Sequence, residues 1–301
     1  MTEQKKTIGL IGAGLMGSGI AASLLRNGYP LTVLEHEGNQ PLGPLLAAGA
    51  ATCASVATLA AQSDIVILCV TGTPQVEAVL FGEDGVLKGL RPGATIIDCS
   101  TAVPSSTVRI AEAVHAAGGR FLDAAMTRTP KEAAEGRLNL IVGGAQEDFE
   151  ACLPIMQAYA ENIVHAGPAG AGHQMKLLHN YVSLGFSAVL AEAAACARRT
   201  GTDPAVFCEV LARGGGGGVV LERLRPFIEH GDVSSFRFTT ANALKDLDYY
   251  CTMAQQQGGR HGVAQSVREL YQSAGGAGLG QAPVPELIDY LAADDAPDTS
   301  L

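Results

Sequence analysis

The chain has 301 residues, of which 47% are hydrophobic and 17% are charged. This length and composition exclude a single small domain and an intrinsically disordered chain. The 20 Lys and Arg residues against 30 Asp and Glu give a formal net charge of −10. Because no stretch is rich in Lys and Arg, we expect no nucleic-acid partner.

The sequence offers no signal for secretion or for membrane insertion. Residues 1–6 are polar and lack the apolar stretch of a signal peptide. The most apolar long stretch, residues 181–197, is interrupted by Glu192, so no membrane span is predicted. The seven cysteines are widely spaced and form no Cys-x-x-Cys pair, which favours neither a disulfide framework nor a zinc site. We therefore expect a cytoplasmic protein with no membrane partner.

Short aliphatic runs alternate with helical stretches in the first half of the chain. These runs predict strands at residues 8–11, 31–35, 65–70, 95–98, 121–125, 138–142 and 163–165. The intervening stretches predict helices at residues 16–27, 105–117 and 146–158. Strands that are apolar on both faces are typical of a mostly parallel sheet covered by helices. The predicted fold class is therefore α/β.

The second half of the chain carries a helical pattern alone. Residues 174–199 predict one helix of about seven turns. Further helices are predicted at residues 204–212, 221–229, 240–256, 263–273 and 283–292. We expect a mobile loop at Gly214–Gly218 and a frayed acidic tail over residues 292–301.

A Gly-x-Gly-x-x-Gly motif directly follows the first predicted strand. Its glycines are Gly12, Gly14 and Gly17, with Leu15 and Met16 between the last two. The first glycine permits a tight turn, the second lets a pyrophosphate approach the backbone, and the third allows close packing of helix on strand. The motif therefore predicts a dinucleotide-binding turn at a helix start.

The choice of dinucleotide depends on Glu35, at the end of the second predicted strand. A carboxylate at this place can accept a hydrogen bond from the ribose 2′-hydroxyl of NAD and repels the 2′-phosphate of NADP. The two residues after it, His36 and Glu37, include no arginine that could neutralise a phosphate. The sequence therefore predicts NAD rather than NADP.

Lys176 and Asn180 lie four residues apart near the start of the long helix and so share one of its faces. The positive end of a helix and the exclusion of water both lower the pKa of a lysine toward the range useful for proton transfer. The pattern indicates an acid/base group with an orienting amide. The alternative is a solvated surface lysine.

Four motifs in order resemble the β-hydroxyacid dehydrogenase family, which includes 3-hydroxyisobutyrate dehydrogenases and tartronate semialdehyde reductases. They are the turn Gly12–Gly17, Asp98-Cys99-Ser100-Thr101, Gly170-x-Gly172 with Lys176 and Asn180, and Lys245-Asp246-Leu247. The resemblance covers nearly the whole chain. It implies a Rossmann-like dinucleotide-binding domain over residues 1–166 and, after a long interdomain helix, an all-helical substrate and oligomerisation domain over residues 167–301.

The resemblance also implies roles for individual residues. Lys176 matches the family's catalytic acid/base, and Asn180 matches an asparagine that contacts the substrate. Ser100 and Thr101 are implied as further substrate contacts. Cofactor contacts are implied for Thr101 near the nicotinamide, for Lys245 from the second domain, and for Val70 and Thr71, which replace the family's usual Leu-Pro pair.

The segment Thr127-Arg128-Thr129 departs from the family pattern, which has Ser-Gly-Gly there to bind the substrate carboxylate. A guanidinium adds a full charge and several donors suited to a larger or more strongly solvated anion. The segment is similar to that of the sulfolactaldehyde reductases, which recognise a sulfonate, although a carboxylate would also suit an arginine. The alternative for Arg128 is a solvated side chain or a pair with Glu132.

These patterns predict an NAD-dependent dehydrogenase or semialdehyde reductase that acts on a small anionic hydroxy acid or its aldehyde, without a metal. A sulfolactaldehyde reductase is the more specific alternative, and an imine reductase-like enzyme or a non-catalytic dinucleotide-binding sensor are the others. We expect a homodimer or homotetramer, because the long apolar helix exposes more hydrophobic surface than a small helical domain covers.

Overall fold

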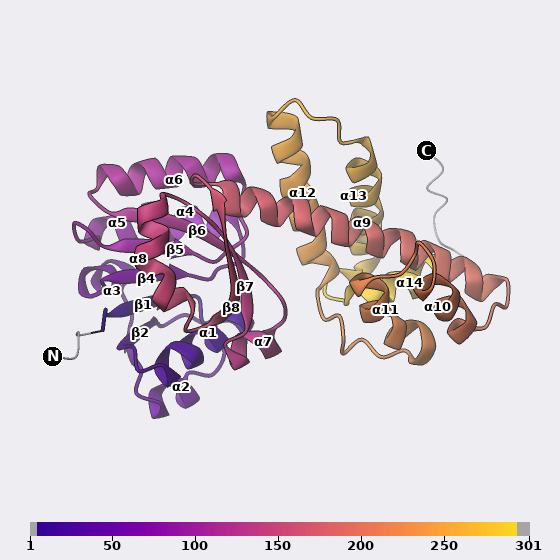
Figure 1. The fold of residues 1–301 in the computed structure, drawn as a ribbon, viewed down its shortest axis with the longest axis horizontal. Helices are drawn as coiled ribbons and strands as arrows, with labels where there is room; N and C mark the ends of the chain where they lie inside the picture. The colour runs from indigo at the N-terminus through magenta and orange to yellow at the C-terminus, as the bar shows by residue number, and fades with distance from the viewer. Residues whose placement is uncertain (1–4, 294–301) are drawn as a thin grey trace. The chain divides into compact units, whose positions relative to one another are not determined.

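The computed structural model describes residues 5–293 (Figure 1). The described residues up to Lys176 form one compact unit, and those from Leu177 onward form a second. From residue 294, the predicted acidic tail lies outside the described residues.

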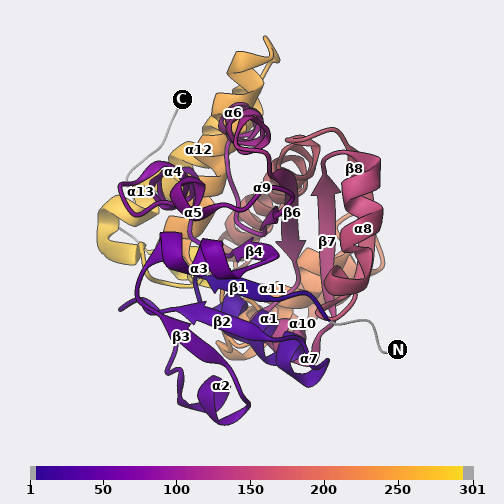
Figure 2. The ribbon, with the colours of Figure 1, turned by 90° about the vertical axis from the view of Figure 1, so that its left-hand side faces the viewer.

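The N-terminal unit is built on one eight-stranded sheet with the strand order β3-β2-β1-β4-β5-β6-β7-β8. The strands are β1 (Ile8–Ile11), β2 (Leu31–Leu34), β3 (Ala51–Cys53), β4 (Ile65–Leu68), β5 (Thr95–Asp98), β6 (Arg120–Thr127), β7 (Leu138–Gly143) and β8 (Ala160–Gly167). All neighbours are parallel except β6 and β7, which lie side by side with opposite directions in Figure 2. The predicted mostly parallel sheet is confirmed.

Helices cover both faces of this sheet. They are α1 (Leu15–Arg26), α2 (Gly43–Ala47), α3 (Val56–Gln62), α4 (Thr73–Phe81), α5 (Val86–Gly89), α6 (Pro104–Ala116), α7 (Pro130–Glu135) and α8 (Gln146–Met156). In β4, Ile65 and Ile67 pack in the core with α1 and α8, whereas Val66 and Leu68 pack in the core with α3, α4 and α6. Burial on both faces explains why the strand shows no polar alternation.

The aliphatic runs do not predict β3, α2 to α5 or α7. β3 has three residues, each exposed or half-buried, so it carries little hydrophobic signal. The missed helices are four to nine residues long, too short to show a helical period clearly.

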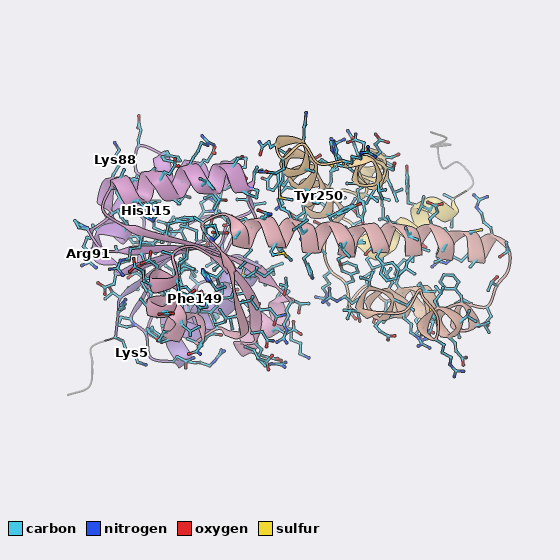
Figure 3. The ribbon with its side chains drawn as sticks, turned by 45° about the horizontal axis from the view of Figure 1, so that its top comes forward. Lys5, Lys88, Arg91, His115, Phe149 and Tyr250 are labelled. Atoms are coloured by element: carbon cyan, nitrogen blue, oxygen red, sulfur yellow. The ribbon has the colours of Figure 1, made fainter. Side chains whose placement is uncertain are left out.

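The C-terminal unit is helical, as predicted. Its helices are α9 (Ala171–Arg199), which begins in the N-terminal unit, α10 (Pro204–Ala212), α11 (Val219–His230), α12 (Thr240–Gln256), α13 (Gly262–Ala274) and α14 (Leu287–Ala292), with short turns η1 (Gly275–Leu279) and η2 (Val284–Glu286). The helix predicted over residues 283–292 is divided between η2 and α14. Tyr181 of α9 and Tyr250 of α12 stack with ring centroids 4.1 Å apart; Tyr250 is labelled in Figure 3.

Among the described residues, α9 alone is long and apolar enough to cross a membrane by length and composition. In its most apolar window, 44% of the residues are buried inside the structure. Leu184, Leu190 and Ala191 are among those that pack in the core of the C-terminal unit. A helix that forms the core of a globular protein passes the same test, so this feature is weak evidence for a membrane span.

Candidate functional site

The glycine turn between β1 and α1 is shaped for a phosphate group. Gly12 has φ +96°, and a Cβ added there would lie 2.3 Å from the carbonyl oxygen of Cys69. A Cβ at Gly17 would lie 1.9 Å from the carbonyl oxygen of Gly12, whereas one at Gly14 would meet nothing within 4 Å. Two glycines are thus required by packing, and the middle one leaves the backbone open. Such a cradle fits a dinucleotide pyrophosphate at the start of α1.

Leu15 and Met16 form the first turn of α1. Leu15 is 65% exposed and Met16 is half-buried. The N-cap residue, Gly14, makes no side-chain cap, so the first amides of α1 have no capping side chain at this residue.

Asn39 braces this turn, a role that the sequence analysis missed. Its Oδ1 accepts a hydrogen bond from Ala13 N at 3.0 Å, and its Nδ2 donates to Leu34 O at 2.8 Å. The asparagine therefore joins the glycine turn to the end of β2. Glu35, which follows β2 directly, is exposed, so its carboxylate is accessible to a ligand at this edge of the sheet.

Val70 and Ser100 are joined where β4 and β5 end. Ser100 Oγ accepts a hydrogen bond from Val70 N at 3.1 Å, and Ser100 N donates to Asp98 Oδ1 at 2.9 Å. Thr71 is exposed and Thr101 is half-buried. Because β1, β2, β4 and β5 are parallel, the residues that follow these strands lie along the same edge of the sheet, where α/β proteins bind their ligands.

The segment after β6 is organised by local contacts. Thr127 Oγ1 accepts a hydrogen bond from Asn139 Nδ2 at 3.2 Å. Thr129 caps α7 in a capping box with Glu132, whose pKa is lowered chiefly by the Thr129 hydroxyl. These contacts show how the turn is held without a glycine pair.

Arg128 has a special conformation in this segment. It is the one non-glycine residue with positive φ, +82°, among the described residues. Its guanidinium pairs with the Glu161 carboxylate and donates to Arg137 O. This hydrogen bond and charge lower the pKa of Glu161. The carboxylate that pairs with Arg128 is thus that of Glu161, and not that of Glu132, the partner considered from the sequence.

The start of α9 is tied to the sheet by Asp123. This fully buried carboxylate accepts hydrogen bonds from Gly170 N and His173 N, both at 2.8 Å. It also explains why α9 begins at Ala171, earlier than predicted, because two amides of the helix start are satisfied. Lys176 follows on the second turn of α9 and is half-buried.

In the C-terminal unit, Asn180 belongs to a buried polar network. Asn180 Nδ2 donates to Asp246 Oδ2 at 2.6 Å, and His179 Nδ1 lies 3.0 Å from Asn180 Oδ1. Lys245 Nζ pairs with Asp246 Oδ1 at 2.8 Å and lies 5.2 Å from the ring centroid of Tyr249. Asp246 therefore links the amide of Asn180 to the ammonium of Lys245.

One of these positioning residues, Asp246, stands inside a motif quoted above, Lys245-Asp246-Leu247. Asp123 lies within the strand predicted at residues 121–125, where its signal is a carboxylate among apolar neighbours. Asn39 has no such signal, since asparagine is common in loops.

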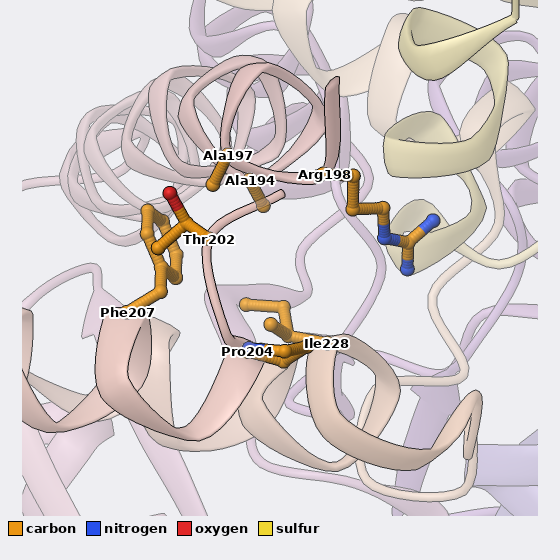
Figure 4. Close-up of a pocket in the computed structure, with 7 residues that line it drawn as sticks. All are labelled: Ala194, Ala197, Arg198, Thr202, Pro204, Phe207 and Ile228. Atoms are coloured by element: carbon orange, nitrogen blue, oxygen red, sulfur yellow. The ribbon is translucent and has the colours of Figure 1, made fainter. Parts of the chain in front are cut away.

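A small pocket in the C-terminal unit is separate from these residues (Figure 4). It is lined by Ala194, Ala197, Arg198, Thr202, Pro204, Phe207 and Ile228. Its lining is mostly apolar, and the guanidinium of Arg198 is paired with Asp289. The pocket lacks the convergent polar groups of a catalytic site. Over residues 5–293, there is also no cluster of three or more His, Cys, Asp or Glu side chains that could hold a metal ion.

Comparisons with known proteins match both halves of the chain. Residues 7–167 match the family described as the NAD binding domain of 6-phosphogluconate dehydrogenase, and residues 170–291 match that described as NAD-binding of NADP-dependent 3-hydroxyisobutyrate dehydrogenase. The 3-sulfolactaldehyde reductase of Escherichia coli (strain K12) is 32% identical over 285 residues, which cover 94% of this chain and 95% of that protein.

Two further relatives are 3-hydroxyisobutyrate dehydrogenases. That of Pseudomonas aeruginosa is 34% identical over 220 residues, which cover 73% of this chain and 74% of that protein. The crystal structure of that from Salmonella typhimurium has a TM-score of 0.83 at 28% identity and covers 95% of this chain and 99% of that chain.

Proposed function

This chain belongs to the β-hydroxyacid dehydrogenase family, and we propose that it transfers a hydride between nicotinamide C4 and the carbinol carbon of a small anionic hydroxy acid or its aldehyde. It is an oxidoreductase with NAD(P)-binding domains, like its named relatives. One observation carries the proposed mechanism. Asp123 ties the helix start that carries Lys176 to the sheet that bears the glycine turn.

The glycine turn and the strand ends would hold the cofactor, which supplies or accepts the hydride when bound. The open backbone at Gly14 would receive the pyrophosphate, and Gly12 and Gly17 keep the turn tight. Val70, Thr71 and Thr101 would contact the nicotinamide part, and Lys245 would contribute a further cofactor contact.

Lys176 moves the proton that balances the hydride. In oxidation its neutral Nζ takes the substrate hydroxyl proton as the hydride leaves, and in reduction its protonated Nζ donates to the aldehyde oxygen. Asn180, one helical turn later, contacts the substrate. The hydrogen bond from Asn180 to Asp246 supports this role by fixing which way the amide points.

The anionic group of the substrate is bound by the segment Thr127, Arg128 and Thr129, together with Ser100 and Thr101. A guanidinium offers a charge and paired donors to a carboxylate or a sulfonate. Because Arg128 is paired with Glu161 in the structure, an anionic substrate would compete with this carboxylate for the guanidinium. The similarity to a 3-sulfolactaldehyde reductase supports a sulfonate substrate.

NAD is the preferred cofactor in this proposal. Glu35 is exposed at the end of β2, where a carboxylate suits a ribose 2′-hydroxyl and opposes a 2′-phosphate. One matching family is described as NADP-dependent, which makes the direct comparison of NADH with NADPH informative.

A homodimer or homotetramer is supported by an exposed apolar stripe on α9. Met175, Val182 and Val189 follow one another at intervals of seven residues and are 44%, 68% and 62% exposed. Seven residues make nearly two helical turns, so these side chains lie on one face. Such a stripe suits a second copy of the chain.

A cytoplasmic location is supported by the cysteines. All seven are free thiols in the structure, and free thiols are typical of proteins in reducing compartments.

The experiment that tests this function is a screen of NADH oxidation with sulfolactaldehyde, succinic semialdehyde, methylmalonate semialdehyde and tartronate semialdehyde. We expect turnover of at least one of them, and preference for sulfolactaldehyde would identify a sulfonate reductase. Tight NADH binding without turnover of any of them would favour a dinucleotide-binding sensor, whereas turnover of cyclic imines alone would favour an imine reductase-like enzyme.

A further inference from the structure

A polar pair is buried in the N-terminal unit at the start of α9. His173 is 0% exposed and Asp98, at the end of β5, is 1% exposed. His173 Nε2 lies 3.9 Å from Asp98 Oδ2, and neither atom has a hydrogen-bond partner among the described residues. Buried polar atoms in proteins are nearly always partnered, so this pair requires a physical explanation.

The hydrogen bonds of Thr107 assign the proton on one side of the histidine ring. The Thr107 hydroxyl donates its single proton to Val103 O at 3.2 Å. Its oxygen lies 2.8 Å from His173 Nδ1, so Nδ1 carries a proton and donates it. In a neutral ring, Nε2 then presents a lone pair to Asp98 Oδ2. A carboxylate facing a lone pair is repulsive, whereas one proton shared by the pair, carried by either Nε2 or the carboxyl group, makes the contact attractive.

The groups around Asp98 favour retention of this proton. Burial raises the pKa of Asp98, with a further contribution from Asp123 on β6, against the opposing effects of His173 and Ser100. Cys69, directly after β4, carries no charge, because burial raises the pKa of its thiol to about 12. Thr107, on α6, is also neutral.

The pair connects two parts of the proposed site. Asp98 Oδ1 holds the amide of Ser100, which begins the turn that continues into Thr101. His173 is three residues before Lys176, and its own amide is held by Asp123. A change in the distance between Asp98 and His173 therefore moves the helix start relative to the Ser100 turn.

We propose that His173 is a positioning residue: one proton shared with Asp98 fixes the first turn of α9, and hence Lys176, relative to the turn that carries Ser100 and Thr101. The effect of this positioning on catalysis by Lys176 rests on the proposed function, whereas the existence of the shared proton does not.

Two substitutions of similar volume separate proton sharing from packing. In Asp98→Asn, the amide oxygen can accept from Ser100 N and the amide nitrogen can donate to His173 Nε2, so the variant imitates the protonated pair and should keep kcat near the wild-type value. Asp98→Leu removes both contacts. We expect its kcat to fall on the order of 10²-fold, as for a displacement of about 1 Å.

Two histidine variants complete the set. His173→Phe should lower kcat by about as much as Asp98→Leu does. His115→Gln, at an exposed position on α6, should have the kcat of the wild type. Equal kcat values for Asp98→Asn and Asp98→Leu would overturn the proposal, because packing alone would then account for the site.

The pH profile gives a readout that packing would not change. In hydroxy acid oxidation, the wild-type rate should fall at alkaline pH as the shared proton is lost. Asp98→Asn has no such proton to lose and should not show this fall. The same alkaline fall in both proteins would contradict the proposal.

NMR of the histidine ring nitrogens tests the shared proton without turnover. We expect a protonated Nδ1 on His173 and a change at Nε2 in Asp98→Leu. An unprotonated Nδ1 would overturn the proton assignment. If these NMR signals are found but no substrate is turned over, the proposed function is wrong and the shared proton stands. If a substrate is turned over but Asp98→Asn and Asp98→Leu have the same kcat, the positioning role of His173 is wrong and the proposed function stands.

Discussion

Arg128 lies in the turn that we propose binds the anionic group of the substrate. Positive φ is costly for a side chain with a Cβ and is the region where glycine is at ease, and glycine is what the family pattern has here. The strain is opposed by the contacts of the guanidinium with Glu161 and Arg137 O. A strained residue at a binding segment is typical of functional positions.

The competition for the Arg128 guanidinium is measurable through KM. Glu161→Gln should lower KM for the anionic substrate by a modest factor, because the Glu161 carboxylate is 47% exposed and water weakens the pair. Arg128→Ala should raise KM by about tenfold to hundredfold, the size of a charge-assisted hydrogen bond, with little change in kcat. An unchanged KM in Arg128→Ala would remove this residue from substrate binding.

We propose that Glu35 sets the preference for NAD over NADP. Glu35→Ala should reduce the preference for NADH over NADPH by about tenfold, since one hydrogen bond to the ribose is lost and a repulsion is removed. The ratio of kcat/KM with NADH to kcat/KM with NADPH measures this preference. Glu37→Ala, an exposed acid two residues on, is the matched control, and equal ratios in both variants would contradict the assignment.

At the scale of elements, the long helix depends on a single carboxylate. Asp123 lies at the point where β6 leaves the parallel part of the sheet and satisfies two amides at the start of α9. A buried donor left without an acceptor costs about 1–3 kcal/mol. The start of α9 is therefore sensitive to the loss of this carboxylate.

Asp123→Ala should lower the free energy of unfolding by about 2–5 kcal/mol, because two buried amides lose their acceptor. It should also lower kcat, since Lys176 follows on the next turn. Urea unfolding and steady-state kinetics measure the two effects. Asp203→Ala, which removes the exposed N-cap of α10, should destabilise the protein less and leave kcat unchanged; an equal effect on kcat would contradict the link between Asp123 and Lys176.

Among the elements, hydrophobic patterns predict the bounds well where a segment is long or buried. β1, β5 and α12 have the predicted bounds, because each is strongly apolar or clearly periodic. β3 and α7 are not predicted, because they are short and partly exposed. The contacts of Asn39, Asp123 and Asp246 join residues far apart in the sequence, and local patterns carry no information on such pairings.

At the scale of the whole molecule, the proposed oligomer follows from the apolar stripe on α9. A double variant Val182→Glu/Val189→Glu should dissociate the assembly, because each charge would be buried without a partner at the contact. Light scattering gives the mass. Val263→Glu, at an equally exposed position on α13, should leave the mass unchanged. A wild-type mass of 30.9 kDa, that of one chain, would contradict the oligomer.

The proposed mechanism of the whole enzyme depends on proton exchange by Lys176, and the kinetics of Lys176→Ala test this exchange most directly. Aldehyde reduction and NADH binding are measured in this variant and in Lys88→Ala, whose lysine is exposed on α5. We predict that Lys176→Ala keeps the wild-type Kd for NADH and loses kcat on the order of 10²- to 10⁴-fold, while Lys88→Ala behaves as wild type. A kcat close to that of the wild type in Lys176→Ala would contradict the mechanism.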